Sequence, residues 1–160
     1  MIREGVMKKR IISLAIVLLS VCSVAKAYSY TTPQIVKESD CKRGNAIACY
    51  YASVAYRASN PEKENDYLER ACDLGCGAAC IDRSVKYVRL KDNRQAGKWL
   101  EKACNKGDPK GCRLLAYAYE DGIDGFRQSY VKAKSYYQRG CAMADESSCQ
   151  SLKDIRKAGY

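Results

Sequence analysis

Cysteines recur along this chain in four pairs of one spacing, Cys-x7-Cys, and this repeat constrains the fold more than any other feature of the sequence. The first members of successive pairs lie 31, 32 and 37 residues apart. A unit of about 30 to 40 residues is typical of solenoid proteins, in which each unit packs on its neighbours. The pairs are Cys41 with Cys49, Cys72 with Cys80, Cys104 with Cys112, and Cys141 with Cys149.

Other positions keep phase with the cysteines, which indicates that the units share one structure. Four further columns align: the small residues Ser53, Ser84 and Ala116; the tyrosines Tyr56, Tyr87 and Tyr119; the aromatics Tyr67, Trp99 and Tyr136; and the small residues Ala71, Ala103 and Gly140. Apolar and small side chains recur at helical spacing after each second cysteine and before the next first cysteine. We therefore expect two helices per unit, in close contact at the small residues.

The segment inside each cysteine pair predicts a tight connection between helices. One column of this segment suits a left-handed helix C-cap, for which glycine is favoured, and it holds Gly44, Gly75, Gly107 and Ala144. The next column falls where a helix N-cap is expected, and it holds Asn45, Cys76, Asp108 and Asp145. Because Asn and Asp are preferred N-caps, each cysteine pair should join the end of one helix to the start of the next.

The sequence therefore predicts an all-α protein, an α/α solenoid of three helix pairs closed by a C-terminal capping helix. The expected units are residues 41–71, 72–103 and 104–140. The cap is expected at residues 141–160, with its helix at about 146–157. Residues 28–40 have no partner helix and are expected to form an N-terminal tail.

Residues 1–27 predict a cleaved secretory signal peptide. A basic stretch with Lys8, Lys9 and Arg10 precedes an apolar run of 14 residues and a small-x-small site that ends at Ala27. A lipoprotein signal at Cys22 is the alternative. The run is short for a transmembrane helix, so we expect a secreted or periplasmic protein without stable membrane insertion. Part of the net charge of +10 belongs to this segment, and the remainder favours solubility, with binding to anionic surfaces as the alternative.

An exported chain enters an oxidising compartment, where closely spaced cysteines are usually bridged. We expect one disulfide in each of the four pairs, each stabilising the fold by about 2 to 3 kcal/mol on the chain-entropy model. Free buried cysteines that pack as small apolar groups are the alternative.

Cys76 belongs to none of the four pairs. Our hypothesis is that this thiol, at a helix N-terminus, is free and reactive or links two chains into a disulfide-bonded homodimer. An idle thiol is the plainer alternative. A mixed pairing with Cys72 or Cys80 is a third, although neighbours in one helix are poorly placed for a bridge.

The chain contains no histidine, and this limits the chemistry it can perform. A His-based catalytic triad and a zinc site of the usual His-containing kind are excluded. No phosphate-cradling loop, nucleic-acid-binding module or paired-carboxylate site is evident. We therefore expect no catalytic, cofactor-binding or metal-binding residues, no cofactor and no nucleic-acid partner.

The pattern resembles the Sel-1-like repeat, in the disulfide-bearing form of the Helicobacter cysteine-rich proteins. The resemblance runs from Cys41 to about Ile155 and is closest between Cys112 and Cys141. It implies a right-handed superhelix of antiparallel helix pairs, related to tetratricopeptide arrays, with a concave face. The first two units depart from the pattern because their hairpin turns are short and lack its glycine.

Two functions follow from this resemblance. Repeat helices present a broad surface, so we expect a scaffold that binds another protein and that faces the host. The alternative is beta-lactamase or penicillin-binding activity, by which relatives of this family are described. A serine enzyme of that type needs Ser-x-x-Lys, Ser-Asp-Asn and Lys-Thr-Gly. A Ser-x-x-Lys stands at Ser129 to Lys132, the chain has neither partner motif, and Ser129 stands where a helix N-cap is expected.

Thirteen tyrosines favour the binding function, because tyrosine offers contact area with a polar tip. The tyrosines of the aligned columns are expected to fill the core. Tyr50, Tyr117 and Tyr137 lie outside those columns, so we expect them at the surface.

Overall fold

The computed structural model describes residues 38–123 and 125–160, and every regular element in that part of the chain is a helix. This confirms the predicted all-α fold. The helices are α2 (Glu38–Lys42), α3 (Ala46–Tyr56), α4 (Pro61–Asp73), α5 (Gly77–Arg89), α6 (Asn93–Asn105), α7 (Pro109–Asp121), α8 (Tyr130–Ala142) and α9 (Glu146–Lys157).

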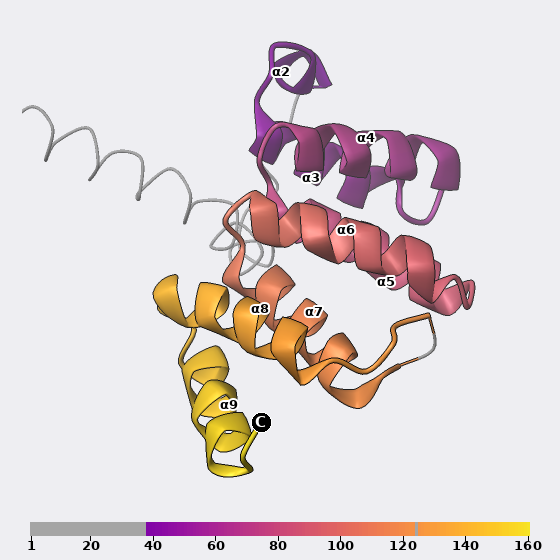
Figure 1. Ribbon diagram of the computed structural model, residues 1–160. Helices are drawn as coiled ribbons and strands as arrows, with labels where there is room; N and C mark the ends of the chain where they lie inside the picture. The colour runs from indigo at the N-terminus through magenta and orange to yellow at the C-terminus, as the bar shows by residue number, and fades with distance from the viewer. Residues whose placement is uncertain (1–37, 124) are drawn as a thin grey trace, which may run out of the picture.

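Three antiparallel helix pairs, α3 with α4, α5 with α6 and α7 with α8, stack one after another (Figure 1). The second helices α4, α6 and α8 lie side by side on the viewer's side, and the first helices lie behind them. We call the outer surface of α3, α5 and α7 the first-helix face. Helix α9 packs on α8 and closes the array, as predicted.

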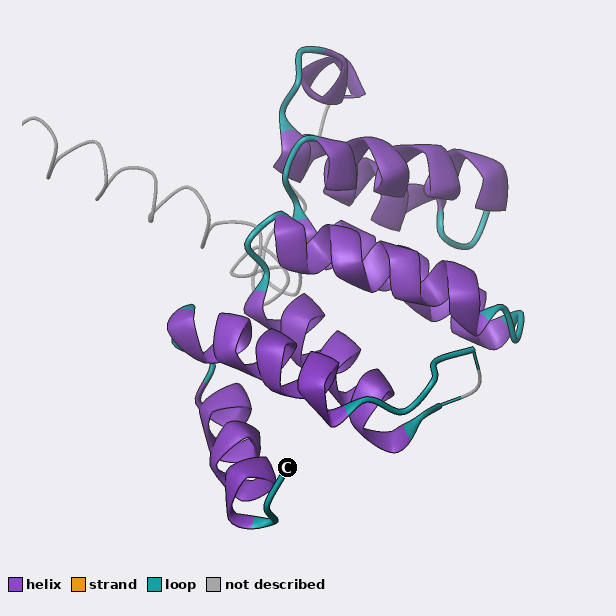
Figure 2. Cartoon of the chain, viewed as in Figure 1, coloured by secondary structure: helices purple, strands orange, loops and turns teal. Residues whose placement is uncertain are grey.

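Two classes of turn lie on opposite edges of the stack (Figure 2). The turns between pairs contain a left-handed residue at each predicted position, with φ values of 94°, 100° and 84° at Gly44, Gly75 and Gly107. The predicted N-caps follow, and the side chain of Asn45, for example, accepts a hydrogen bond from the Ala48 amide at 3.0 Å. Each of these turns reverses the chain within three residues, so each unit begins beside the previous one.

Small residues let the helices approach closely. Ser53, Ser84 and Ala116 are fully or almost fully buried, as are Ala71 and Ala103. A Cβ atom added to Gly140 would lie 2.4 Å from Oγ of Ser148 in α9. The aligned columns are therefore the contact surfaces of successive helices, as the sequence predicts.

The signal peptide predicted for residues 1–27 lies outside the described residues, as does most of the predicted tail. Residues 38–40 are an exception, because they open helix α2 and Cys41 is buried within it. The tail boundary expected at residue 40 is therefore wrong by a few residues. Among the described helices, none has the length and apolar character that crossing a membrane requires.

Candidate functional site

Four disulfides join the helix pairs at the positions that the spacing predicts. Each links cysteines eight positions apart, with Cα atoms 4.5 to 4.9 Å from one another, and each spans one turn between units. The bonded pairs are Cys41–Cys49, Cys72–Cys80, Cys104–Cys112 and Cys141–Cys149. Each bridge ties the end of one helix to the start of the next, so it fixes each unit against the one before it.

Cys76 stands at the N-cap of α5, as predicted, and its side chain makes no capping hydrogen bond. The residue is fully buried and disulfide-bonded, outside the four bridges above. No free cysteine is present in the described part of the chain, so the expectation of a free thiol at Cys76 is wrong. A buried sulfur that is already bonded also gives no basis for the expected covalent homodimer.

The three tyrosines outside the aligned columns differ in burial, which the sequence did not predict. Tyr117 is exposed, but Tyr50 and Tyr137 are only 4% and 2% exposed, so their expected surface position is wrong. Each buried hydroxyl donates a hydrogen bond to a carboxylate, from Tyr50 to Asp82 at 3.0 Å and from Tyr137 to Glu120 at 2.6 Å. Burial raises the pKa of both phenols well above the usual value. Both rings are therefore structural anchors.

A groove of about 760 Å³ lies between the first two helix pairs. Helices α3 and α5 form its walls, and Glu64 and Asn65 of α4 also line it. Its remaining lining residues include the aromatic and aliphatic side chains Tyr50, Tyr51, Val54, Val85, Tyr87 and Leu90, and the charged side chains Arg57, Asp82, Arg83, Lys86 and Arg89. The groove opens on the first-helix face and combines apolar walls with polar groups, as binding sites commonly do.

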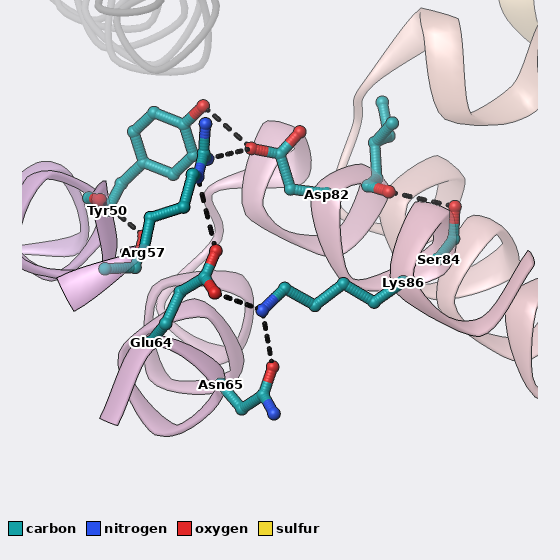
Figure 3. A network of polar contacts seen from close by, with 9 residues as sticks. Tyr50, Arg57, Glu64, Asn65, Asp82, Ser84 and Lys86 are labelled. Carbon is teal, nitrogen blue, oxygen red and sulfur yellow. Dashed lines mark hydrogen bonds and ion pairs between the residues drawn. The ribbon is translucent and has the colours of Figure 1, made fainter. Parts of the chain in front are cut away.

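A connected polar network forms the floor of this groove (Figure 3). Glu64 is only 4% exposed, and its two carboxylate oxygens accept from Arg57, at 3.3 Å, and from Lys86. Lys86 also donates to Asn65 at 2.9 Å, and Arg57 pairs with Asp82 at 3.4 Å. Because both carboxylates are matched by cations from neighbouring helices, the floor joins α3, α4 and α5.

The sequence did not predict this network, although one signal was present. Glu64 shares the spacing of Leu68, Ala71 and Cys72 along α4, and all four are buried. A carboxylate on the buried face of an amphipathic helix requires a partner, because an unpaired buried charge is costly. That partner could not be identified from the sequence, since Arg57 and Lys86 belong to different helices.

The Ser-x-x-Lys sequence has a structural explanation. Ser129 is the N-cap of α8, and its side chain accepts from the Lys132 amide at 3.4 Å. The ammonium group of Lys132 lies 4.7 Å from the centre of the Tyr119 ring, in a cation–π contact. Within residues 38–123 and 125–160, no group of three or more His, Cys, Asp or Glu side chains is arranged to hold a metal ion.

Comparison with known proteins identifies the repeat. A family model described as the Sel1 repeat matches residues 46–76, 87–108 and 109–145. Among solved structures, a Sel1 repeat protein from Oxalobacter formigenes superposes with a TM-score of 0.64 at 25% identity, covering 73% of this chain and 94% of that one. Helicobacter pylori cysteine rich protein B superposes with a TM-score of 0.58 at 27% identity, covering 71% of this chain and 87% of that one.

Two curated relatives match this chain over less than half of its length. The protein named cytochrome c oxidase assembly factor 7A, from Xenopus laevis, is 34% identical over 79 residues, which are 46% of this chain and 34% of that protein. Its counterpart from Xenopus tropicalis is 35% identical over 78 residues, 46% of this chain and 33% of that protein. The chain thus spans about a third of the length of these relatives.

Proposed function

Because the chain belongs to the Sel1 repeat family, we propose that it is a disulfide-stapled scaffold that binds another protein through its first-helix face. Repeat arrays use an extended surface of stacked helices for binding. The groove between α3 and α5 lies on that surface and holds both apolar and charged side chains.

The distribution of exposed apolar side chains carries this proposal. In the described part of the chain, eight large hydrophobic residues are exposed, and five of them belong to α5, α7 and the residues directly after these helices: Val85, Val88, Leu90, Tyr117 and Ile123. Contiguous apolar exposure on one face marks interaction surfaces in soluble proteins. The second helices contribute only Val131, together with Leu74 at the end of α4.

We place this scaffold in the periplasm or outside the cell, where it would face the host. Two observations support the location. The first 27 residues have the sequence pattern of a signal peptide. The four intramolecular disulfides are of a kind that persists in oxidising compartments. Fractionation of cells that express the full chain tests the location, and a protein that stays reduced in the cytoplasm would contradict it.

The binding surface can be tested with a matched pair of charge substitutions. Leu90 lines the groove and is 73% exposed, whereas Val131 of α8 is 81% exposed on the opposite layer. Oxidised protein without residues 1–27 is used as bait against periplasmic and host extracts. Leu90→Glu should abolish capture of the partner, and Val131→Glu should leave it unchanged. Equal capture by both variants would show that the partner binds elsewhere.

The beta-lactamase alternative has a separate test. Purified oxidised protein is incubated with a chromogenic cephalosporin beside a boiled control. The scaffold proposal predicts no turnover above that control. Turnover that survives purification and is lost in Ser129→Ala would instead support a hydrolase.

A further inference from the structure

The first-helix face carries a line of side chains in equivalent positions of successive units. Val54, Val85 and Tyr117 each stand five residues after the second cysteine of their unit. Helices α5 and α7 are in contact, so equal positions along them lie side by side. Val85 and Tyr117 are 40% and 51% exposed. The line therefore forms an apolar path that crosses the first helices.

Charge changes sign along this path. Nine residues after the second cysteine stand Arg89 in α5 and Asp121 in α7, both exposed. Arg57 and Lys86 line the groove on the α3 and α5 side. Arg57 and Arg89 thus stand at one end of the apolar path, and Asp121 stands at the other.

The carboxylates in the groove do not cancel its basic character. Glu64 is buried and paired with Arg57 and Lys86, while Asp82 accepts from Tyr50 and pairs with Arg57. These contacts orient both acids into the floor. The side chain of Arg57 is 54% exposed, and Arg89 is exposed at the rim. A partner that approaches the groove therefore meets positive charge first.

We propose, resting on the function proposed above, that this face takes an extended segment of a partner protein that is acidic at one end and basic at the other. Its acidic end lies over α3 and α5, its apolar side chains lie over Val85 and Tyr117, and its basic end lies over α7. An extended segment advances about 3.3 Å per residue, so a segment of several residues is needed to cross the first helices.

Synthetic peptides provide the probes. The first is a labelled peptide of two glutamates, three leucines and two lysines in that order. The second has the same composition with the charges alternating, and two shorter probes keep either the glutamates or the lysines with the leucines. Fluorescence anisotropy measures binding to the oxidised protein without residues 1–27 at low salt, where charge pairs at a rim are weakly screened. The ordered peptide should bind about tenfold more tightly than the alternating one.

Charge substitutions then test the acidic end and the basic end of the bound segment one at a time. Arg89→Glu should weaken the glutamate probe about fivefold and leave the lysine probe as strong or stronger. Asp121→Lys should do the reverse. Arg89→Lys, which keeps the charge, should retain binding of the glutamate probe. Lys98→Glu makes the same change of charge on exposed α6 and serves as the control, with no selective effect expected.

The outcomes distinguish this inference from the proposed function. If Leu90→Glu weakens every probe but the charge substitutions change none selectively, the binding face stands and the charge order is overturned. If Leu90→Glu also has no effect on the probes or on capture of a partner, the proposed binding face is itself overturned. A dimer in sedimentation velocity that Leu90→Glu dissociates would overturn the inference too, because a second copy would then cover the face.

Discussion

At the scale of single residues, the turns between helices contain two side chains in a conformation that suits glycine. Lys91 and Ala144 have φ values of 58° and 62°. Ala144 stands in the column that holds glycine in the other three inter-unit turns, and the sequence predicted its conformation. The conformation of Lys91 was not predicted, because its hairpin turn is shorter than that of the third unit. In the third unit Gly122 takes the left-handed conformation, at φ 64°.

Replacing Ala144 with glycine should stabilise the protein. A left-handed conformation costs an alanine about 1 to 2 kcal/mol, part of which glycine loses again through its more flexible unfolded chain. We expect Ala144→Gly to raise the free energy of unfolding by about 0.5 to 1 kcal/mol, measured by urea denaturation of the oxidised protein. Ala142→Gly, two residues earlier in helix α8, is the control and should lower it by about 1 kcal/mol. A loss in both variants would contradict the argument.

The buried tyrosines predict a loss of stability in alkali. Desolvation and the neighbouring Glu38 carboxylate raise the pKa of the partly buried Tyr67 to about 12, and burial raises those of Tyr50 and Tyr137 further. An unfolded tyrosine loses its proton near pH 10, so above that pH the unfolded chain binds fewer protons than the folded one. The free energy of unfolding should therefore fall as the pH rises from 10 towards 12.

Phenylalanine substitutions test this cause. Denaturation at pH 9, 10 and 11 should give a shallower decline for Tyr137→Phe than for the unaltered protein. Tyr117→Phe is the comparison, since that ring is exposed and contributes less. An unchanged slope in Tyr137→Phe would show that another group causes the loss.

At the scale of helices, a ladder of basic side chains joins each second helix to the one before it. Arg70 donates to the Lys42 carbonyl at 3.0 Å, Lys102 pairs with Asp73, and Arg139 donates to Asn105 at 2.7 Å. Each cation stands two residues before the first cysteine of its pair, and each contact lies one residue after the preceding first cysteine. The column was present in the sequence, but its partners became evident only when the helices were placed side by side.

The long hairpin of the third unit has a packing role. Phe126 in this turn packs edge-on against Tyr119, with the ring centres 5.2 Å apart. A Cβ atom on Gly97 of α6 would lie 2.3 Å from the Phe126 ring. The sequence places the extra residues of the third unit in this turn but indicates no role for them. In the structure they tie α7 and α8 to the preceding pair.

Gly97→Ala should displace Phe126 and lower the free energy of unfolding by about 1 to 3 kcal/mol, as overpacking does. Phe126→Ala should also destabilise, because it removes a ring from the contact. The double variant should lose less than the sum of the two single losses, since the alanine methyl group then has room. Strict additivity in urea denaturation would contradict a direct contact.

At the scale of the whole molecule, the repeat phase predicted the fold, the helix pairs and the four bridged positions, because those depend on spacing along the chain. The buried network around Glu64 and the burial of Tyr50 and Tyr137 were not predicted, because they depend on which face the next unit covers. The position of a residue within its own unit does not show whether the next unit will cover it. The proposed binding face was not predicted for the same reason, because its side chains come from three separate units.

Site-specific photo-crosslinking tests the central claim, that the first-helix face binds another protein, most directly. A benzophenone amino acid is placed at Val85 in the groove or at Val131 on the opposite layer, and cells that express either variant are irradiated. A discrete adduct with another protein is expected from position 85 and none from position 131. Adducts from position 131 alone would contradict it.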